Sequence, residues 1–193
     1  MARIQDPRAN YIAVATKLFG RDGFHGTSLA SIAQEAGVSK QALLHFFGTK
    51  EKLYGEVLAT LANRLESRIE ATSMPDPVDH LTAYLTDFAA SVLAQPADAK
   101  LVVRALVDSN PKARVWPMKP YLDKLTALTR SASRGGLSED AARAWSFQII
   151  GALQYLAISS AAIRGMYGNT TLDSMMEHHQ NFVARSVFDL VKS

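Results

Sequence analysis

The sequence contains no cysteine among its 193 residues. This absence excludes disulfide bonds, cysteine-bound zinc, iron–sulfur clusters and a thiol nucleophile, and it agrees with the cytoplasm, where we expect the protein. The first ten residues are polar and charged, so we expect no secretory signal. The patterns H-E-x-x-H, E-x-x-H, G-x-S-x-G, G-x-G-x-x-G and the P-loop are also missing. We therefore expect neither an enzyme nor a cofactor.

The sequence shows no convincing period-2 alternation and no internal repeat, so its apolar spacing predicts helices throughout. Asp6 caps the first helix, Pro7 opens it, and Gly20 and Gly23 are expected to end it. The later helices are predicted at 28–36, 39–47, 50–71, 78–95, 97–109, 118–131, 139–164 and 171–191. The fold class is all-α: an N-terminal three-helix domain at 1–50, then a helical bundle at 51–193, with about nine helices in total.

Positive charge is in excess in only one part of the chain. Residues 1–55 hold seven lysines and arginines against four acidic residues, whereas the remaining residues carry 14 of each sign. An excess at one end is where a polyanion such as DNA would be met. Residues 145–163 carry no charge and are about long enough to cross a bilayer. Their glutamines, serines and glycine favour a helix buried in protein, and we expect no membrane association.

The stretch from Thr27 to Phe47 contains two short helices joined by a tight turn. Thr27 or Ser28 can cap the first, Gly37 suits the left-handed position that stops it, and Ser39 caps the second. Two short helices around a glycine-containing turn are typical of the DNA-binding helix-turn-helix, here at about 28–47.

A helical projection of the second helix separates two faces. Leu43, Phe47, Phe46 and Ala42 form the predicted inner face, and the outer face consists of Lys40, Gln41, Leu44 and His45. Three of these four outer side chains donate hydrogen bonds or carry charge. Gln41 could pair with an adenine edge, and Lys40 with guanine or a phosphate. A solvated helix face in some other bundle has the same pattern, so the spacing alone leaves both interpretations open.

The run from Ala15 to Leu58 resembles the N-terminal domain of the TetR family of transcriptional regulators. The matching positions are Leu18-Phe19, Gly23-Phe24, Thr27-Ser28, Ile32-Ala33, Ala36 to Ser39, Leu43, Phe47 and Lys50-Glu51. This resemblance covers about 50 residues. It implies a bacterial, ligand-responsive regulator, most commonly a repressor, that binds a palindromic DNA operator and is released by a small molecule.

The resemblance also implies roles for single residues. Thr27 and Ser28 would contact phosphate through hydroxyl and backbone N–H groups. Base edges would be faced by Ser39, Lys40, Gln41 and Ala42. His45 stands where the family has an aromatic phosphate contact, and Lys50 would hold the DNA backbone.

Two positions depart from the family pattern. The family commonly has tyrosine where Leu44 stands and histidine where Phe46 stands. Leu44 cannot bond a phosphate, although it could touch a thymine methyl group. We therefore expect the affinity or the operator preference to differ from the family norm.

By the same resemblance, the last two helices, 139–164 and 171–191, would form a homodimer, and the C-terminal bundle would bind a small-molecule effector. Low charge in the first of these helices suits burial at a two-fold interface. The candidate pocket residues are Tyr84, Phe88, Trp116, Met118, Tyr121, Phe147, Gln148, Gln154 and Tyr155. Aromatic and polar side chains suit an apolar ligand site, but simple core packing is an alternative role for each of them.

Two other classes of function remain as alternatives. One is a helical small-molecule-binding protein that never meets DNA, and the other is an enzyme without DNA binding. The first leaves the basic excess of residues 1–55 unexplained, and the second has no visible catalytic motif. A metal site at His178 and His179 is not expected, because adjacent histidines on a helix point about 100° apart and do not easily share one ion.

Overall fold

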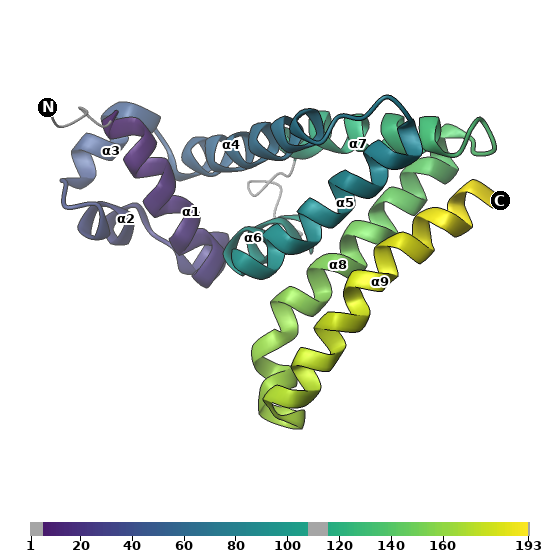
Figure 1. Ribbon diagram of the computed structural model, residues 1–193. Coiled ribbons are helices and arrows are strands. Elements are labelled where there is room, and N and C mark those ends of the chain that lie inside the picture. The colour runs from purple at the N-terminus through teal and green to yellow at the C-terminus, as the bar shows by residue number, and fades with distance from the viewer. Residues whose placement is uncertain (1–5, 108–115, 193) are drawn as a thin grey trace, which may run out of the picture. The chain divides into compact units, whose positions relative to one another are not determined.

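The computed structural model describes residues 6–107 and 116–192. Within these ranges the chain forms nine α-helices and one short 3₁₀ helix, without a strand, which confirms the all-α prediction. The helices are α1 (Pro7–Gly26), α2 (Leu29–Glu35), α3 (Lys40–Phe47), α4 (Lys50–Ala71), α5 (Pro77–Ala94), α6 (Pro96–Val107), α7 (Lys119–Ala132), α8 (Glu139–Tyr167) and α9 (Asn169–Lys192), with η1 at Trp116–Met118 (Figure 1). Apart from the first helix, the described helix ends lie within three residues of their predicted positions. The predicted end at Ser109 lies outside the described residues.

The chain divides into two compact units that are discontinuous in sequence. The N-terminal unit comprises residues 1–62 and 97–118, and the C-terminal unit comprises 63–96 and 119–193, in each case as far as they are described. Helix α4 therefore contributes residues to both units, and α6 belongs with the N-terminal helices. The domain boundary predicted after residue 50 does not coincide with the division into these compact units, and it stays a prediction.

Helix α1 begins as predicted, breaks at a predicted glycine and continues for a short segment beyond it. The Asp6 carboxylate accepts a hydrogen bond from the Arg8 N–H at 3.0 Å, and Pro7 occupies the first turn. All five apolar positions that define its period are buried: Tyr11, Ile12, Ala15, Leu18 and Phe19. As predicted, the regular helix ends at Gly23, whose φ is 76°, and a short second helical segment then continues α1 to Gly26. Glycine adopts this left-handed conformation without the steric cost of a Cβ atom.

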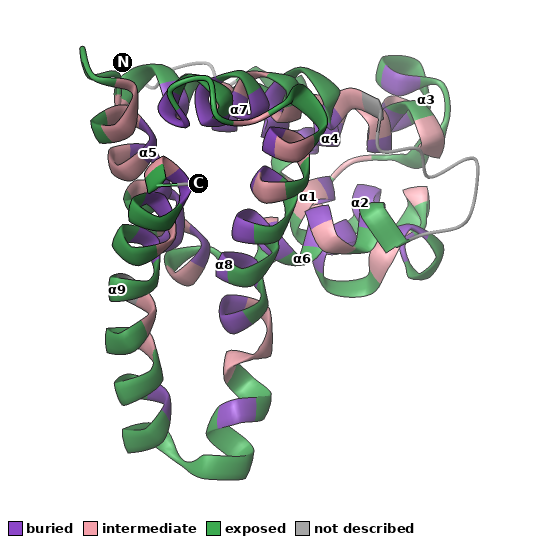
Figure 2. Cartoon of the chain, turned by 90° about the vertical axis from the view of Figure 1, so that its right-hand side faces the viewer, coloured by how far each residue is buried: buried purple, intermediate pink, exposed green. Residues whose placement is uncertain are grey.

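The C-terminal unit is built on α5, which contacts α7, α8 and α9, while α8 also packs against α7 and α9. Asp76 caps α5 through hydrogen bonds from the N–H groups of Val78 and Asp79, and Ser138 caps α8. The far end of the α8–α9 hairpin is held by a small apolar cluster of Leu156, Ile163, Leu172 and Met176. Most other residues there are exposed, as the green segments of Figure 2 show.

Helix α8 is less buried than its sequence predicted. It is the one described helix that is long and apolar enough to cross a membrane, and 44% of its most apolar window is buried within the chain. Its buried side includes Ile149, Ile150 and Leu153, whereas Phe147 and Tyr155 are exposed. The same helix therefore has one face in the core and one apolar face that this chain leaves uncovered.

Candidate DNA-binding surface

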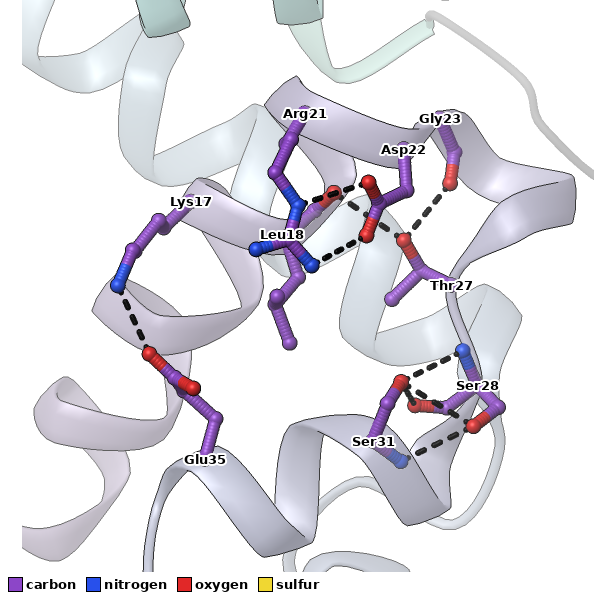
Figure 3. Close-up of polar contacts among 9 residues, drawn as sticks. All are labelled: Lys17, Leu18, Arg21, Asp22, Gly23, Thr27, Ser28, Ser31 and Glu35. Atoms are coloured by element: carbon purple, nitrogen blue, oxygen red, sulfur yellow. Dashed lines mark hydrogen bonds and ion pairs between the residues drawn. The ribbon is translucent and has the colours of Figure 1, made fainter.

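Reciprocal hydrogen bonds fix the start of α2. The Ser28 hydroxyl oxygen accepts from the Ser31 N–H at 3.0 Å, and the Ser31 hydroxyl oxygen accepts from the Ser28 N–H at 3.0 Å (Figure 3). Such a capping box satisfies two N–H groups that a helix start otherwise leaves without partners. Ile32 and Ala33 are buried one turn later. Helix α2 is thus anchored at its first turn and along its inner side.

The turn between α2 and α3 is set by Gly37 and Ser39. Gly37 has a φ of 68°, and the Val38 N–H returns to the Ala33 carbonyl at 2.9 Å. This left-handed residue with a returning N–H is the usual glycine stop of a helix. The Ser39 hydroxyl oxygen then accepts from the Ala42 N–H at 3.1 Å and starts α3. Both caps lie where the sequence predicted them.

Helix α3 is amphipathic in the way that a recognition helix requires. Leu43 and Phe47 are 0% and 4% exposed and anchor the helix from behind. On the opposite side the exposed residues are Lys40, Gln41, Leu44 and His45, with Ser39 exposed and Ala42 half-buried beside them. An exposed, polar helix face supported by a second helix is the form that enters the major groove in helix-turn-helix proteins. The base and phosphate contacts of these residues stay predictions.

Phe46 does not lie on the inner face, so that prediction was wrong. Its side chain is 42% exposed, and its ring meets the Tyr11 ring edge-on with centroids 5.3 Å apart. An eight-residue helix buries only a narrow stripe, here the positions of Leu43 and Phe47. Phe46 flanks that stripe and covers the edge of α1 rather than entering the core.

The Thr27 side chain is buried and hydrogen-bonded within the N-terminal unit. It is 2% exposed, and its hydroxyl donates toward the Gly23 carbonyl at 2.8 Å and the Leu18 carbonyl at 3.2 Å (Figure 3). The predicted phosphate contact through this hydroxyl therefore needs correction, because the group already closes the end of α1. Ser28 is exposed, and it keeps its predicted role as a phosphate contact.

Lys50 points back into the domain instead of outward. Its ammonium lies 2.9 Å from the Phe24 carbonyl and 3.1 Å from the Thr27 carbonyl, and 4.2 Å from the centroid of the Phe24 ring. Lys50 thus ties the α1–α2 connection to the first turn of α4. Lys52, which the sequence analysis did not single out, is exposed on that turn. Its position two residues after Lys50, on another side of the helix, was the available signal.

Ion pairs neutralise three of the basic side chains of the N-terminal region, so its unpaired positive charge lies on a few residues. Arg8 pairs with Glu56 at 2.5 Å, and Lys17 pairs with Glu35 at 2.8 Å. Arg21 makes two hydrogen bonds to Asp22, at 2.8 and 2.7 Å (Figure 3). The hydrogen bond from Lys17 lowers the pKa of Glu35, and that from Arg21 lowers the pKa of Asp22. Since these three cations are neutralised locally, the cations that remain in the described part of residues 1–55 are Lys40, Lys50 and Lys52.

The structure brings together some of the predicted pocket residues. The Tyr84 hydroxyl donates to the Tyr121 hydroxyl at 2.8 Å, and the rings of Tyr84 and Phe88 lie 6.0 Å apart. Burial raises the pKa of both tyrosines above the ordinary value. Met118 and Gln154 are also buried.

Three other residues predicted to line the pocket have exposed side chains: Phe147, Gln148 and Tyr155. They lie on the outer side of α8, so their inclusion in an internal pocket was wrong. Tyr155 instead borders a surface hollow of about 520 Å³, together with His178, His179 and Phe182 of α9. The side chain of Trp116 lies outside the described residues.

Comparison with known proteins agrees with this geometry. Residues 12–57 match the family described as bacterial regulatory proteins, tetR family. The chain is 51% identical over 47 residues to the HTH-type transcriptional regulator RutR of Escherichia coli K12, which covers 24% of this chain and 22% of RutR. It therefore spans less than a quarter of that relative. It is also 29% identical over 146 residues to the uncharacterized HTH-type regulator YxaF of Bacillus subtilis, covering 71% and 75% of the two chains.

Solved structures extend the similarity of fold to nearly the whole chain. A putative tetR family transcription regulator from Shewanella sp. PV-4 has a TM-score of 0.71 at 19% identity, covering 96% of this chain and 97% of that one. The regulator FadR of Bacillus subtilis has a TM-score of 0.69 at 17% identity, covering 91% and 96%. Residues 12–57 thus match the tetR family in sequence, and the chain as a whole shares the fold of solved regulators of that family.

Proposed function

We propose that this protein is a cytoplasmic, ligand-responsive transcriptional regulator, a repressor, that binds a palindromic DNA operator as a homodimer. A small molecule bound in the C-terminal helical region would release it from DNA. The observation that carries the proposal is the outer face of α3, where Lys40, Gln41 and His45 are exposed while Leu43 and Phe47 anchor the helix. The names of its relatives as transcriptional regulators support the same function.

The distribution of charge supports DNA as the partner. Once the local ion pairs of α1 are counted, the basic side chains that face solvent near α3 are Lys40 and Lys52. Phosphate contacts from such residues supply affinity and orientation, whereas side chains on the recognition helix supply sequence preference. Lys52 and Ser28 would serve the first role, and Gln41 the second.

The uncovered face of α8 and α9 supports a homodimer. Its exposed apolar side chains include Tyr155, which is 68% exposed, and Phe182 and Phe188 of α9. Residues 145–163 of α8 bear no charge, so burying the α8 part of this face against a second copy would desolvate no ion. A dimer also has a physical motive, since two recognition helices about 34–36 Å apart read a palindrome more specifically than one helix reads a half-site.

A ligand in the C-terminal region is supported by a structural neighbour, the FadR of Bacillus subtilis, which was solved in complex with stearoyl-CoA. In this chain the buried Tyr84–Tyr121 pair and Gln154 provide polar groups among apolar side chains. A few polar groups in an apolar lining are typical of small-molecule sites. Release from DNA would follow if the ligand has a higher affinity for a conformation that does not fit the operator than for the conformation that fits it.

Fluorescence anisotropy with the DNA upstream of the protein's own gene tests the proposal. The full chain should bind one palindromic segment far more tightly than a scrambled duplex, and its affinity should fall steeply as salt rises. A small-molecule binder without DNA function, or an enzyme, predicts no sequence preference. Equal binding to both duplexes at every salt concentration would therefore reject the regulator.

A further inference from the structure

One side chain on the outer face of α3 differs in chemistry from its neighbours. Leu44 is 38% exposed, while the exposed residues around it, Lys40, Gln41 and His45, are polar or charged. We propose that Leu44 reads the 5-methyl group of a thymine in each operator half-site and that Gln41 reads an adenine close to it. This inference rests on the proposed function and specifies two of the bases that the regulator recognises in each half-site.

The packing of α3 does not require a large apolar side chain at position 44. Leu43 and Phe47 fill the inner face completely, at 0% and 4% exposure. The other exposed apolar residue of the helix, Phe46, has a structural partner, because its ring lies edge-on to Tyr11. Leu44 flanks the inner face on the other side, next to Lys40 and Gln41 in the helical projection. Its apolar surface is thus available to a partner on the DNA-facing side.

The major groove offers few partners to a leucine. Base edges there present hydrogen-bond donors and acceptors, and the 5-methyl group of thymine is the one apolar group among them. A leucine cannot bond to a phosphate, a guanine or a cytosine edge, so contact with thymine is the interaction that rewards its burial. Gln41 has the complementary chemistry, because its amide can both donate to and accept from the N6 and N7 atoms of adenine.

The spacing of the two residues limits where the two bases lie. Residues three apart on a helix have Cβ atoms about 5–6 Å from each other. Successive base pairs rise by about 3.4 Å. Gln41 and Leu44 therefore reach bases that are one or two base pairs apart. The expected half-site contains an adenine and a thymine at that separation.

The experiment replaces each thymine of the operator in turn by deoxyuridine, symmetrically in both half-sites, and measures the affinity of the full chain by fluorescence anisotropy. Deoxyuridine pairs like thymine but lacks the methyl group. At one thymine position the replacement should weaken wild-type binding about fourfold per half-site, because burying one methyl group contributes about that factor to affinity. At that position Leu44→Ala should bind the thymine and deoxyuridine operators equally well.

Two variants serve as controls. Leu44→Met keeps the apolar volume and should retain the dependence on the methyl group. Leu106→Ala truncates a leucine of similar exposure, 41%, on α6. It should leave the dependence of affinity on the methyl group unchanged. Circular dichroism verifies that each variant is folded.

The second arm replaces adenines one or two base pairs away by 7-deazaadenine, which lacks the N7 acceptor. Gln41→Ala should be insensitive to the position that weakens the wild type. The proposal is overturned if no thymine replacement affects the wild type, or if Leu44→Ala loses the same factor as the wild type. A wild-type protein without any operator preference would instead reject the proposed function itself.

Discussion

Lys50 and Lys52 stand on one helical turn but should act in different ways, and replacing each by methionine separates them. Methionine keeps an apolar stem and removes the ammonium. Lys50→Met deletes the hydrogen bonds to the Phe24 and Thr27 carbonyls and the contact with the Phe24 ring. Lys52→Met deletes only an exposed charge.

The magnitude follows from the contacts that are lost. A hydrogen bond to a charged group contributes about 1.5–3 kcal/mol net, and a cation–π contact at a partly exposed site about 0.5–1 kcal/mol. Lys50 is half-buried and its ammonium is shared between two carbonyls, so the contributions do not simply add. We expect Lys50→Met to lower the free energy of unfolding by about 2–3 kcal/mol. For Lys52→Met the expected change is below about 0.5 kcal/mol.

Two assays measure the difference. Urea unfolding followed by circular dichroism reports stability, and the slope of log affinity against log salt reports phosphate contacts. Lys52→Met should flatten the slope by about one unit per subunit, whereas Lys50→Met should leave the slope of the folded protein unchanged. If Lys50→Met were as stable as the wild type and flattened the slope, the Lys50 ammonium would contact phosphate. Its proposed role in tying the α1–α2 connection to α4 would then be refuted.

Two further predictions concern packing and assembly. A Cβ added at Gly20 would lie 2.9 Å from the Ala97 carbonyl oxygen, so Gly20→Ala should lower the free energy of unfolding by about 1–3 kcal/mol. Gly55→Ala, which adds its Cβ in open space on α4, should raise it by up to about 1 kcal/mol in the same urea titration, and a stable Gly20→Ala protein would disprove the close contact. Tyr155→Glu should convert the dimer to a monomer in light scattering after gel filtration, while Met74→Glu, at a 50% exposed site before α5, should not; a dimeric Tyr155→Glu chain would move the interface elsewhere.

Local signals explain why the helix-turn-helix could be predicted from the sequence. Caps such as Ser28 and Ser39, and the stop at Gly37, act within a few residues of the backbone that they satisfy. The period of Leu43 and Phe47 likewise fixes the inner face of α3 without reference to the rest of the chain. These features were confirmed because no distant contact competes with them.

Several failures arise from partners that the sequence pattern does not show. Lys50 turns inward because two carbonyls from a segment more than 20 residues earlier accept its ammonium. Thr27 turns inward toward the carbonyls of Leu18 and Gly23, nine and four residues earlier, which an uninterrupted helix would have used for its own backbone hydrogen bonds. Similarly, Phe147 and Tyr155 are apolar residues on a long apolar helix, and composition does not tell the side that packs in the core from the side that this chain leaves exposed.

The central claim is that α3 reads DNA bases, and its most direct test is the doubly substituted chain Gln41→Ala/Leu44→Ala. Both side chains are exposed, so the fold should be preserved. The wild type should prefer the operator over a scrambled duplex by about a thousandfold or more, and the double variant should lose most of that preference while still binding DNA in a salt-dependent way. A folded double variant that discriminates as well as the wild type would contradict the role of α3 as the reading element.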